Sequence, residues 1–220
     1  MQLHFKKCSV YALNEVLVDS FSYQLTSGKT YFIFGQIGLG KSLLLDQVAQ
    51  ASLSESPHLE FSEKPRLSFL FQKNALIPWL TVKENLKLLD LSFDFESDDL
   101  FCALSLKKLL LRKAADLSGG EAQKVNFYRA LAYRPNIILA DEPFASLDIK
   151  QKNQMTKLLS DYVKKHNCLL LWVSHDLIEI CTSADEVLCF SKSKKSFSHA
   201  LEKPEINLQA LSDFIQGGAA

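Results

Sequence analysis

The stretch Gly35-Gln36-Ile37-Gly38-Leu39-Gly40-Lys41-Ser42 decides how the rest of this sequence is interpreted. It fits the phosphate-binding pattern G-x-x-x-x-G-K-[ST]. The apolar run Tyr31–Phe34 before it is typical of a buried strand, and Ser42–Val48 after it is typical of a helix. Glycines let backbone N–H groups converge on one point, and the helix start adds further N–H groups and its positive dipole end. A glycine-rich turn beside solvated side chains is the alternative, but the strand and helix favour a phosphate site in which Lys41 contacts the outer phosphates and Ser42 ligates Mg²⁺.

Composition limits the function classes. The chain has 220 residues, enough for one sizeable core. Lys and Arg together number 25, as do Asp and Glu, so no basic field exists to hold nucleic acid. The five cysteines form no C-x-x-C pair, which leaves metal ligation unsupported and favours reduced, packed thiols. The N-terminus lacks the apolar region of a signal peptide. The longest apolar run, Cys168–Val173, is far shorter than the ~20 residues that span a bilayer. We therefore expect membrane contact only at the periphery or through a partner.

Helix and strand patterns alternate along most of the chain. Strands are expected near residues 3–10, 20–25, 67–71, 137–140, 168–173 and 186–190, and helices near 119–133, 149–166 and 177–181. Such alternation predicts a parallel sheet with helices on both faces. Residues 51–65 are polar and read as a connection. Helical spacing after a capping box at Thr81-Val82-Lys83-Glu84 predicts an inserted helical segment through residue 112. The tail from Lys192 is polar, and its pattern near Leu208–Ile215 predicts one amphipathic helix.

Two acids end a buried strand in Ile137-Ile138-Leu139-Ala140-Asp141-Glu142-Pro143. Ligands of parallel sheets bind at the carboxyl ends of the strands. Asp141 suits a role in holding Mg²⁺ through its water shell. Glu142 suits the group that orients or deprotonates an attacking water. A solvated turn is the alternative, and the phosphate loop earlier in the chain argues against it.

A second candidate phosphate site is Leu117-Ser118-Gly119-Gly120-Glu121. Ser118 and Glu121 fit a capping box, so an ordinary helix start explains part of the pattern. A helix start with two glycines and a hydroxyl also suits a phosphate. Because one nucleotide does not need two such sites, the pattern indicates two chains arranged head to tail, each closing on the nucleotide of the other.

From about Val10 to Phe190 the chain resembles the ATPase subunits of ABC transporters, with the family's motifs in the family's order. These are Walker A (Gly35–Ser42), the Q-loop (Gln72), the signature (Leu117–Glu121), Walker B (Ile137–Pro143), the D-loop (Ser146-Leu147-Asp148) and the switch histidine (His175). The resemblance implies an α/β fold: a P-loop NTPase core of ABC ATPase type. It has a mostly parallel sheet flanked by helices, an N-terminal antiparallel β subdomain and an inserted helical subdomain. It also implies one domain over residues 1–220, the helical subdomain at about 73–118 and a short tail at 192–220.

The resemblance also implies the roles of individual residues. Glu142, His175 and Gln72 would be catalytic: Gln72 contacts the metal and the water, and His175 holds the γ-phosphate. Tyr11 would stack on adenine, although a strand-edge core residue is the alternative. The implied nucleotide contacts are Tyr11, Gly35, Gln36, Ile37, Gly38, Leu39, Gly40, Lys41, Ser42, Leu43, Ser118, Gly119, Gly120 and Asp148. The implied Mg²⁺ ligands are Ser42, Gln72 and Asp141.

The resemblance implies a subunit that binds and hydrolyses ATP with Mg²⁺, on the cytoplasmic face of the membrane. Its partners would be an integral membrane permease, a second copy bound head to tail when ATP is present, and a substrate-binding protein in the full system, but no nucleic acid. Leu76–Asn85 and Asp141–Phe144 resemble importers of the nitrate, sulfonate and taurine type. A soluble ABC ATPase without a permease, such as an iron–sulfur assembly protein, is the alternative. Trp79 close after Gln72 favours the permease, since Trp suits an interface; otherwise Trp79 packs inside the helical subdomain.

Overall fold

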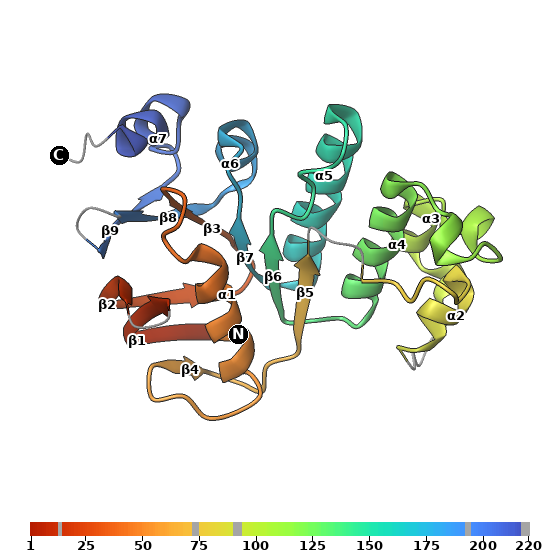
Figure 1. The fold of residues 1–220 in the computed structure, drawn as a ribbon, viewed down its shortest axis with the longest axis horizontal. Helices are drawn as coiled ribbons and strands as arrows, with labels where there is room; N and C mark the ends of the chain where they lie inside the picture. Colours follow the sequence, from red (N-terminus) through yellow and green to blue (C-terminus); the bar gives the residue numbers. More distant parts are fainter. Residues whose placement is uncertain (13–14, 72–74, 90–93, 192–194, 217–220) are drawn as a thin grey trace.

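The computed structural model describes residues 1–12, 15–71, 75–89, 94–191 and 195–216. Its strands, within these ranges, form one nine-stranded sheet in the order β4-β1-β2-β9-β8-β3-β7-β6-β5 (Figure 1). β1 (Gln2–Ala12) pairs in antiparallel fashion with β2 (Glu15–Thr26) and with β4 (Leu59–Phe61). The expected antiparallel part therefore lies at one end of the sheet.

The other end of the sheet is parallel. It consists of β8 (Glu186–Ser191), β3 (Thr30–Gly35), β7 (Leu169–Val173), β6 (Ile137–Asp141) and β5 (Leu67–Phe71). Asp141 at the end of β6 pairs with Phe71 on one side and Val173 on the other. The carboxyl ends of these strands thus meet at one edge, where side chains from distant parts of the chain come together.

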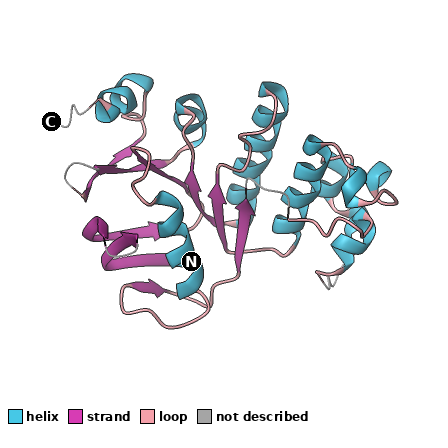
Figure 2. Ribbon diagram, viewed as in Figure 1, coloured by secondary structure: helices cyan, strands magenta, loops and turns pink. Residues whose placement is uncertain are grey.

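Alternate residues of the parallel strands face two separate cores. Phe32, Phe34 and Trp172 belong to the core that includes side chains of the helices α4 (Gly119–Ala132), α5 (Ile149–His166), α6 (Leu177–Ser183) and α7 (Leu208–Ile215). Tyr31 and Ile33 belong to the core that includes α1 (Lys41–Ala51) and the antiparallel strands. Figure 2 shows helices on both sides of the sheet. These strands are continuously apolar in sequence because both of their faces are buried.

The helical segment after β5 is built of short pieces. The capping box predicted at Thr81 and Glu84 is present and starts α2 (Val82–Lys87). Beyond it, α3 (Asp99–Ala103) is the only α-helix described before α4, and the 3₁₀ turns η1 (Phe95–Ser97), η2 (Leu106–Leu109) and η3 (Ala114–Asp116) surround it. Ser105 has a φ of 56°, which stops a regular helix at that point. The helices expected through residue 112 are therefore two short α-helices and two 3₁₀ turns among the described residues.

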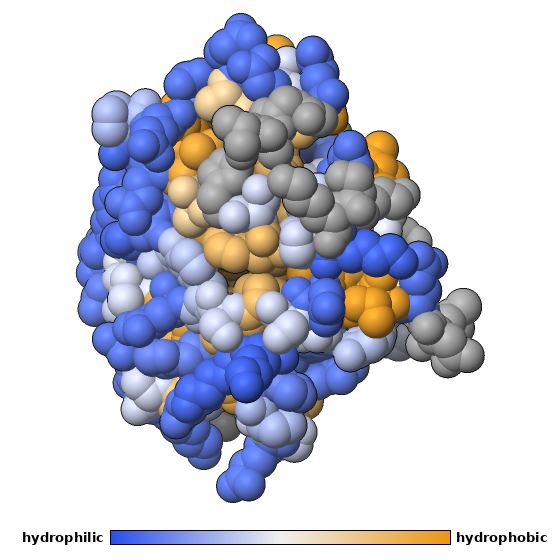
Figure 3. All heavy atoms as spheres, turned by 90° about the vertical axis from the view of Figure 1, so that its left-hand side faces the viewer, coloured by the Kyte–Doolittle hydropathy of each residue, from blue (hydrophilic) through white to orange (hydrophobic). Residues whose placement is uncertain are grey.

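Two strands were not expected from the sequence. β4 lies within the polar connection 51–65, and β9 (Ser196–Glu202) lies in the polar tail. β9 pairs in antiparallel fashion with β8 and makes one parallel pairing with β2, between Ser196 and Asp19. Viewed from the end that carries β1, β2 and β9, the surface is mostly hydrophilic with apolar patches near its centre (Figure 3). No helix among the described residues is both long and apolar enough to pass through a bilayer.

Candidate active site

The phosphate loop connects β3 to α1 and takes backbone conformations that glycine favours. Gly38 and Gly40 have φ values of 78° and 82°. A Cβ atom on Gly40 would lie 2.8 Å from Leu17 Cδ1 and 2.9 Å from Val10 Cγ1. Strands β1 and β2 therefore support the loop from behind and leave no space for a larger residue.

The start of α1 is open to an anion. Gly40 provides no side-chain cap, and the first turn contains no acidic residue. The first backbone N–H groups and the positive dipole end are therefore not neutralised by the helix itself. Such a helix start is a ready site for phosphate oxygens.

Lys41 lies folded against this loop with only 7% of its surface exposed. Its Nζ donates hydrogen bonds to the carbonyl oxygens of Gly35, at 2.9 Å, and Gln36, at 3.0 Å. Burial lowers the pKa of Lys41, while the negative charges of Glu142 and Asp141 act in the opposite direction. An incoming phosphate would replace two neutral acceptors with a charged one, which makes a stronger hydrogen bond.

A cavity of about 760 Å³ joins this loop to the carboxyl ends of β6 and β7. Its described lining is Ile37, Gly38, Leu39, Gly40, Lys41, Ser42, Leu43, Phe71, Ala75, Asp141, Glu142, Ala145, Val173 and His175. Most of the residues predicted for Walker A, together with both Walker B acids and the switch histidine, thus share one cavity. The parallel sheet brings them together although they are far apart in the sequence.

Glu142 has an unused acceptor in this cavity. It has a φ of 47°, and its backbone N–H donates to Val173 O at 3.0 Å, so the residue leaves the strand direction directly after β6. Its Oε1 atom is buried without a hydrogen-bond partner among the described residues, and His175 Nε2 lies 3.5 Å from it. Burial and the neighbouring Asp141 raise the pKa of Glu142, against the opposing charges of Lys152 and Lys41. A carboxylate of raised pKa is a better proton acceptor.

His175 follows β7, in the loop before α6. Burial, and next to it the charge of Lys41, lower its pKa below the ordinary value of 6.5, while Asp141 opposes this shift. This lowered pKa favours the neutral form of the imidazole at pH 7. A neutral imidazole can donate one hydrogen bond and accept another, which suits a group placed between a phosphate oxygen and a water.

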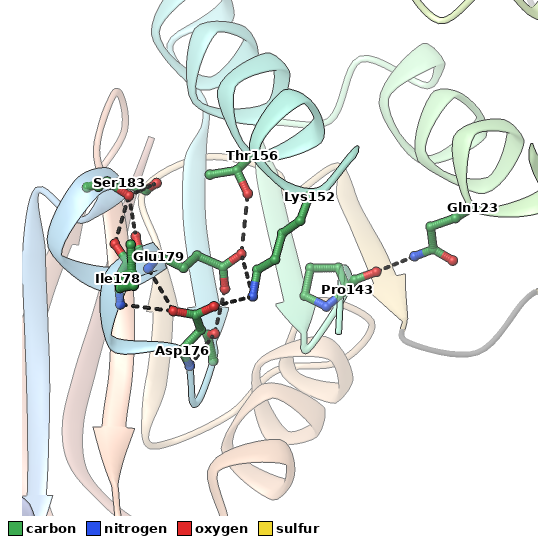
Figure 4. Close-up of polar contacts among 10 residues, drawn as sticks. Gln123, Pro143, Lys152, Thr156, Asp176, Ile178, Glu179 and Ser183 are labelled. Carbon is green, nitrogen blue, oxygen red and sulfur yellow. Dashed lines mark hydrogen bonds and ion pairs between the residues drawn. The ribbon is translucent and has the colours of Figure 1, made fainter. Parts of the chain in front are cut away.

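Figure 4 shows polar contacts in the segments that follow β6 and β7, which sequence reasoning missed. Lys152 of α5 lies between the carboxylates of Asp176 and Glu179, and Gln123 of α4 donates a hydrogen bond to the carbonyl oxygen of Pro143. Asp176 and Glu179 have the spacing of a capping box, which was the one available signal. The Glu179 side chain instead bonds to Ser174 and Thr156.

The signature residues lie outside the cavity. Ser118 caps α4: its Oγ accepts from Glu121 N at 3.3 Å, and Glu121 Oε2 accepts from Ser118 N at 2.9 Å. Gly119 follows on the surface, and a Cβ on Gly120 would lie 2.5 Å from Gln151 Oε1 of α5. The capping box is as predicted, and the structure does not bring this helix start to the phosphate loop of the same chain.

Several other predicted site residues are also outside the cavity lining. Tyr11 is 54% exposed on β1. Asp148 caps α5, where its Oδ1 accepts from Gln151 N at 2.9 Å. The Nε2 of Gln36 donates to Ile215 O of α7 at 3.5 Å. Gln72 lies outside the described residues.

The oxygen donors in the cavity suit Mg²⁺. Ser42 and Asp141 supply a hydroxyl and a carboxylate oxygen, which are donors that this ion prefers. No cluster of three His, Cys, Asp or Glu side chains that could hold a metal occurs in the described part of the chain. The residues present therefore fit an ion that completes its coordination with phosphate oxygens and water, not an all-protein metal site.

Comparison with known proteins agrees with the geometry. The family model described as ABC transporter matches residues 18–145. The chain is 36% identical over 195 residues to the aliphatic sulfonates import ATP-binding protein SsuB 2 of Mesorhizobium japonicum, covering 86% of this chain and 77% of that protein. It is 33% identical to SsuB 3 of Paraburkholderia xenovorans, covering 79% and 70%. It is 32% identical to the molybdenum import ATP-binding protein ModC of Escherichia coli, covering 78% and 53%.

Solved structures share the fold. An inward-facing putative metal-chelate type ABC transporter superposes with a TM-score of 0.77 at 23% identity, covering 96% of this chain and 88% of that one. The dimeric bacterial ABC transporter cassette MJ0796 superposes with a TM-score of 0.72 at 22% identity, covering 91% and 98%. The fold class and the family predicted from the motifs are thereby confirmed. Motif order, shared cavity, family match and relatives lead to one conclusion: the chain belongs to the ABC transporter family.

Proposed function

We propose that this chain is the ATP-binding and ATP-hydrolysing subunit of an ABC importer, and that it powers substrate movement through a separate membrane permease. The observation that carries the proposal is the single cavity lined by Lys41, Asp141, Glu142 and His175. Relatives named as import ATP-binding proteins support the import function.

In this proposal the open start of α1 binds the phosphates of ATP. Backbone N–H groups of the loop from Gly35 to Leu43 surround the β-phosphate, and Lys41 exchanges its carbonyl partners for phosphate oxygens. Ser42 and Asp141 would hold Mg²⁺, with Gln72 as a further ligand. When bound, Mg²⁺ neutralises phosphate charge and helps to orient the γ-phosphate.

Hydrolysis places a water beside Glu142. The Oε1 atom of Glu142, free of other described partners, accepts a proton as the water oxygen bonds to the γ-phosphorus and the bond to the β-phosphate oxygen breaks. Neutral His175, whose Nε2 lies 3.5 Å from Glu142 Oε1, donates a hydrogen bond to the γ-phosphate. Tyr11 stacks on adenine from β1, where its exposure leaves the ring accessible.

A second copy completes the site. Ser118, Gly119 and Gly120 lie outside the cavity of their own chain, so in the proposed head-to-tail dimer they close on the nucleotide of the partner. Asp148, at the exposed start of α5, connects the two sites. ATP supplies the binding energy for this dimer, because it contacts both chains.

The permease docks on the helical subdomain, at about residues 73–118. Trp79 is 72% exposed there, which contradicts its alternative placement in a core. Asn85 holds the Trp79 loop, since its side chain bonds to Ile77 N at 2.8 Å, Ile77 O at 3.1 Å and Thr81 O at 3.1 Å. We place the subunit on the cytoplasmic face of the membrane, with a substrate-binding protein in the full system and no nucleic acid.

The experiment has two parts. The purified chain, with and without its permease, is assayed for phosphate release from MgATP, and affinity-tagged chain is used to isolate its membrane partner. We expect hydrolysis and a co-purifying integral membrane protein. A chain that hydrolyses ATP but associates with soluble proteins alone would refute the importer assignment, and a permease complex without ATPase activity would refute the enzymatic one.

A further inference from the structure

The loop that carries His175 is attached to α5 by an ion-pair network. Lys152 lies one helical turn after Asp148, and its backbone N–H donates to Asp148 O at 2.8 Å. Its Nζ lies 2.7 Å from Asp176 Oδ2 and 3.6 Å from Glu179 Oε1 (Figure 4). The Lys152 side chain is only 17% exposed and that of Glu179 only 5%, so solvent screens these two charges weakly, whereas Asp176 is 39% exposed.

Both neighbours of His175 belong to this network. Ser174 Oγ donates to Glu179 Oε2 and accepts from Asp176 N at 3.1 Å. Asp176 Oδ1 caps α6 by accepting from Ile178 N at 2.9 Å and Glu179 N at 3.1 Å. The backbone on each side of the imidazole is therefore held by groups that Lys152 contacts or neutralises.

Stability alone is a weak reason for this arrangement. A buried ion pair contributes little net free energy, because the loss of hydration offsets the attraction between the charges. What such a network does fix is geometry, since each carboxylate oxygen has an assigned donor. The geometry at issue is the 3.5 Å approach of His175 Nε2 to Glu142 Oε1.

We propose that Lys152 is a positioning residue for ATP hydrolysis: its ammonium group holds the 174–179 loop so that His175 stays aligned with Glu142. The inference rests on the function proposed above. It also gives α5 a defined role, because a shift of the helix start at Asp148 would move Lys152 and, through Asp176, the histidine. Lys152 touches neither nucleotide nor water in this account.

The kinetic test compares Lys152→Met with Lys152→Arg and with Lys157→Met, a control for charge removal at an exposed lysine of the same helix. We expect Lys152→Met to lower kcat about 10- to 100-fold through misalignment, with little change in the KM for MgATP. Lys152→Arg should restore most of kcat, because it keeps a cation at the site. Lys157→Met should behave as wild type.

A second readout does not depend on turnover. The imidazole NMR signal of His175, assigned through His175→Gln, should move in Lys152→Met, while that of His58, which precedes β4 at one end of the sheet, should not. If wild type fails to hydrolyse ATP, the proposed function fails and this readout still tests the inference. Should Lys152→Met not fold, Asp176→Asn replaces it, because Asn keeps the α6 cap and loses the charge. Wild-type kcat with an unmoved His175 signal, or equal loss in Lys152→Met and Lys152→Arg, would overturn the proposal.

Discussion

The starts of α1 and α4 look alike in sequence and differ in structure. Glycines precede α1 and form the first two residues of α4, and both motifs suit a phosphate. The α1 start has neither a side-chain cap nor an acid in its first turn. The α4 start has Ser118 as its cap and Glu121 folded back on it, with Arg112 Nη1 2.8 Å from Glu121 Oε1.

The difference separates two kinds of phosphate site. At α1 the helix start and Lys41 line a cavity, so we expect one chain alone to bind the phosphates. At α4 the Ser118 side chain already accepts a hydrogen bond from a backbone N–H group of the first turn, and the two glycines of this helix lie outside that cavity. The first site should work in an isolated chain. The second should matter only once another chain presents a nucleotide to it.

The largest effect is expected on ATP hydrolysis in the cavity at the start of α1, with nucleotide binding retained. Glu142→Gln removes the proton acceptor of the cavity and keeps its shape, so kcat should fall about 10²- to 10⁴-fold. Equilibrium binding of a fluorescent ATP analogue should persist, since Asp141 and Lys41 remain. Phosphate release near the wild-type rate would show that another group is the base.

Loss of the Lys41 ammonium group should weaken the binding of MgATP. Lys41→Ala removes the charged donor from the phosphate loop, and a charge-assisted hydrogen bond is worth about 1.5–3 kcal/mol, or roughly 10- to 150-fold in affinity. Titration calorimetry with MgATP measures the change. Lys29→Ala is a control for lysine removal, because Lys29 pairs with Glu186 before β3. Equal affinity for wild type and Lys41→Ala would exclude α1 as the phosphate site.

Substitution of the exposed Trp79 should affect binding of the permease and leave nucleotide binding unchanged. Trp79→Ala should weaken permease association by on the order of 2 kcal/mol if it is an interface hot spot. Nucleotide binding by the isolated chain should not change, since Trp79 is not in the cavity lining. Co-purification and surface plasmon resonance measure the association. A misfolded Trp79→Ala chain would contradict the exposed position of this side chain.

The two capping boxes allow a matched comparison at the second site. Ser118→Ala and Thr81→Ala each remove a cap and should each cost about 1 kcal/mol of folding stability. Both should leave nucleotide affinity of the monomer unchanged. Only Ser118→Ala should also reduce ATPase activity of the ATP-bound dimer, because Thr81 starts α2. Equal activity in both variants would remove Ser118 from the composite site.

The smallest expected effect depends on pH. Because burial and Asp141 raise the pKa of Glu142 above its unfolded value, its ionised form destabilises the nucleotide-free fold. Glu142→Gln should therefore have a higher Tm than wild type above the folded-state pKa. The gain should shrink as pH falls through that pKa and disappear below the unfolded-state value of about 4.5, where both states are protonated. Thermal unfolding across this range measures it, and a gain that grows toward acid would reverse the sign of the assignment.

The sequence predicted those parts of the site that follow from the geometry of a parallel sheet and from motif positions. Lys41 and Asp141 were placed together because the ends of parallel strands meet at one edge, whereas His175 was placed there by the family resemblance alone. All three line one cavity in the structure. β9 was missed because its segment is polar, and its pairing with β8 is a contact between chain segments that no local pattern encodes. Lys152 was missed for the same reason: its partners lie 24 and 27 residues away. Tyr11 had a motif position and no local signal, and its role stays a prediction.

The close packing of Leu17 and Val10 around Gly40 limits which substitutions this chain accepts. Because a side chain there would strike both Leu17 and Val10, three positions in separate elements form one unit of mutational constraint. A saturation scan should find Gly40 intolerant in every background, since space made by trimming Leu17 would still leave the unfavourable φ of 82°. Enlarging Val10 or Leu17 should be harmful in proportion to added volume. The antiparallel strands contain none of the Walker motifs. Substitutions at Val10 and Leu17 should nevertheless be restricted, because these side chains pack against the phosphate loop.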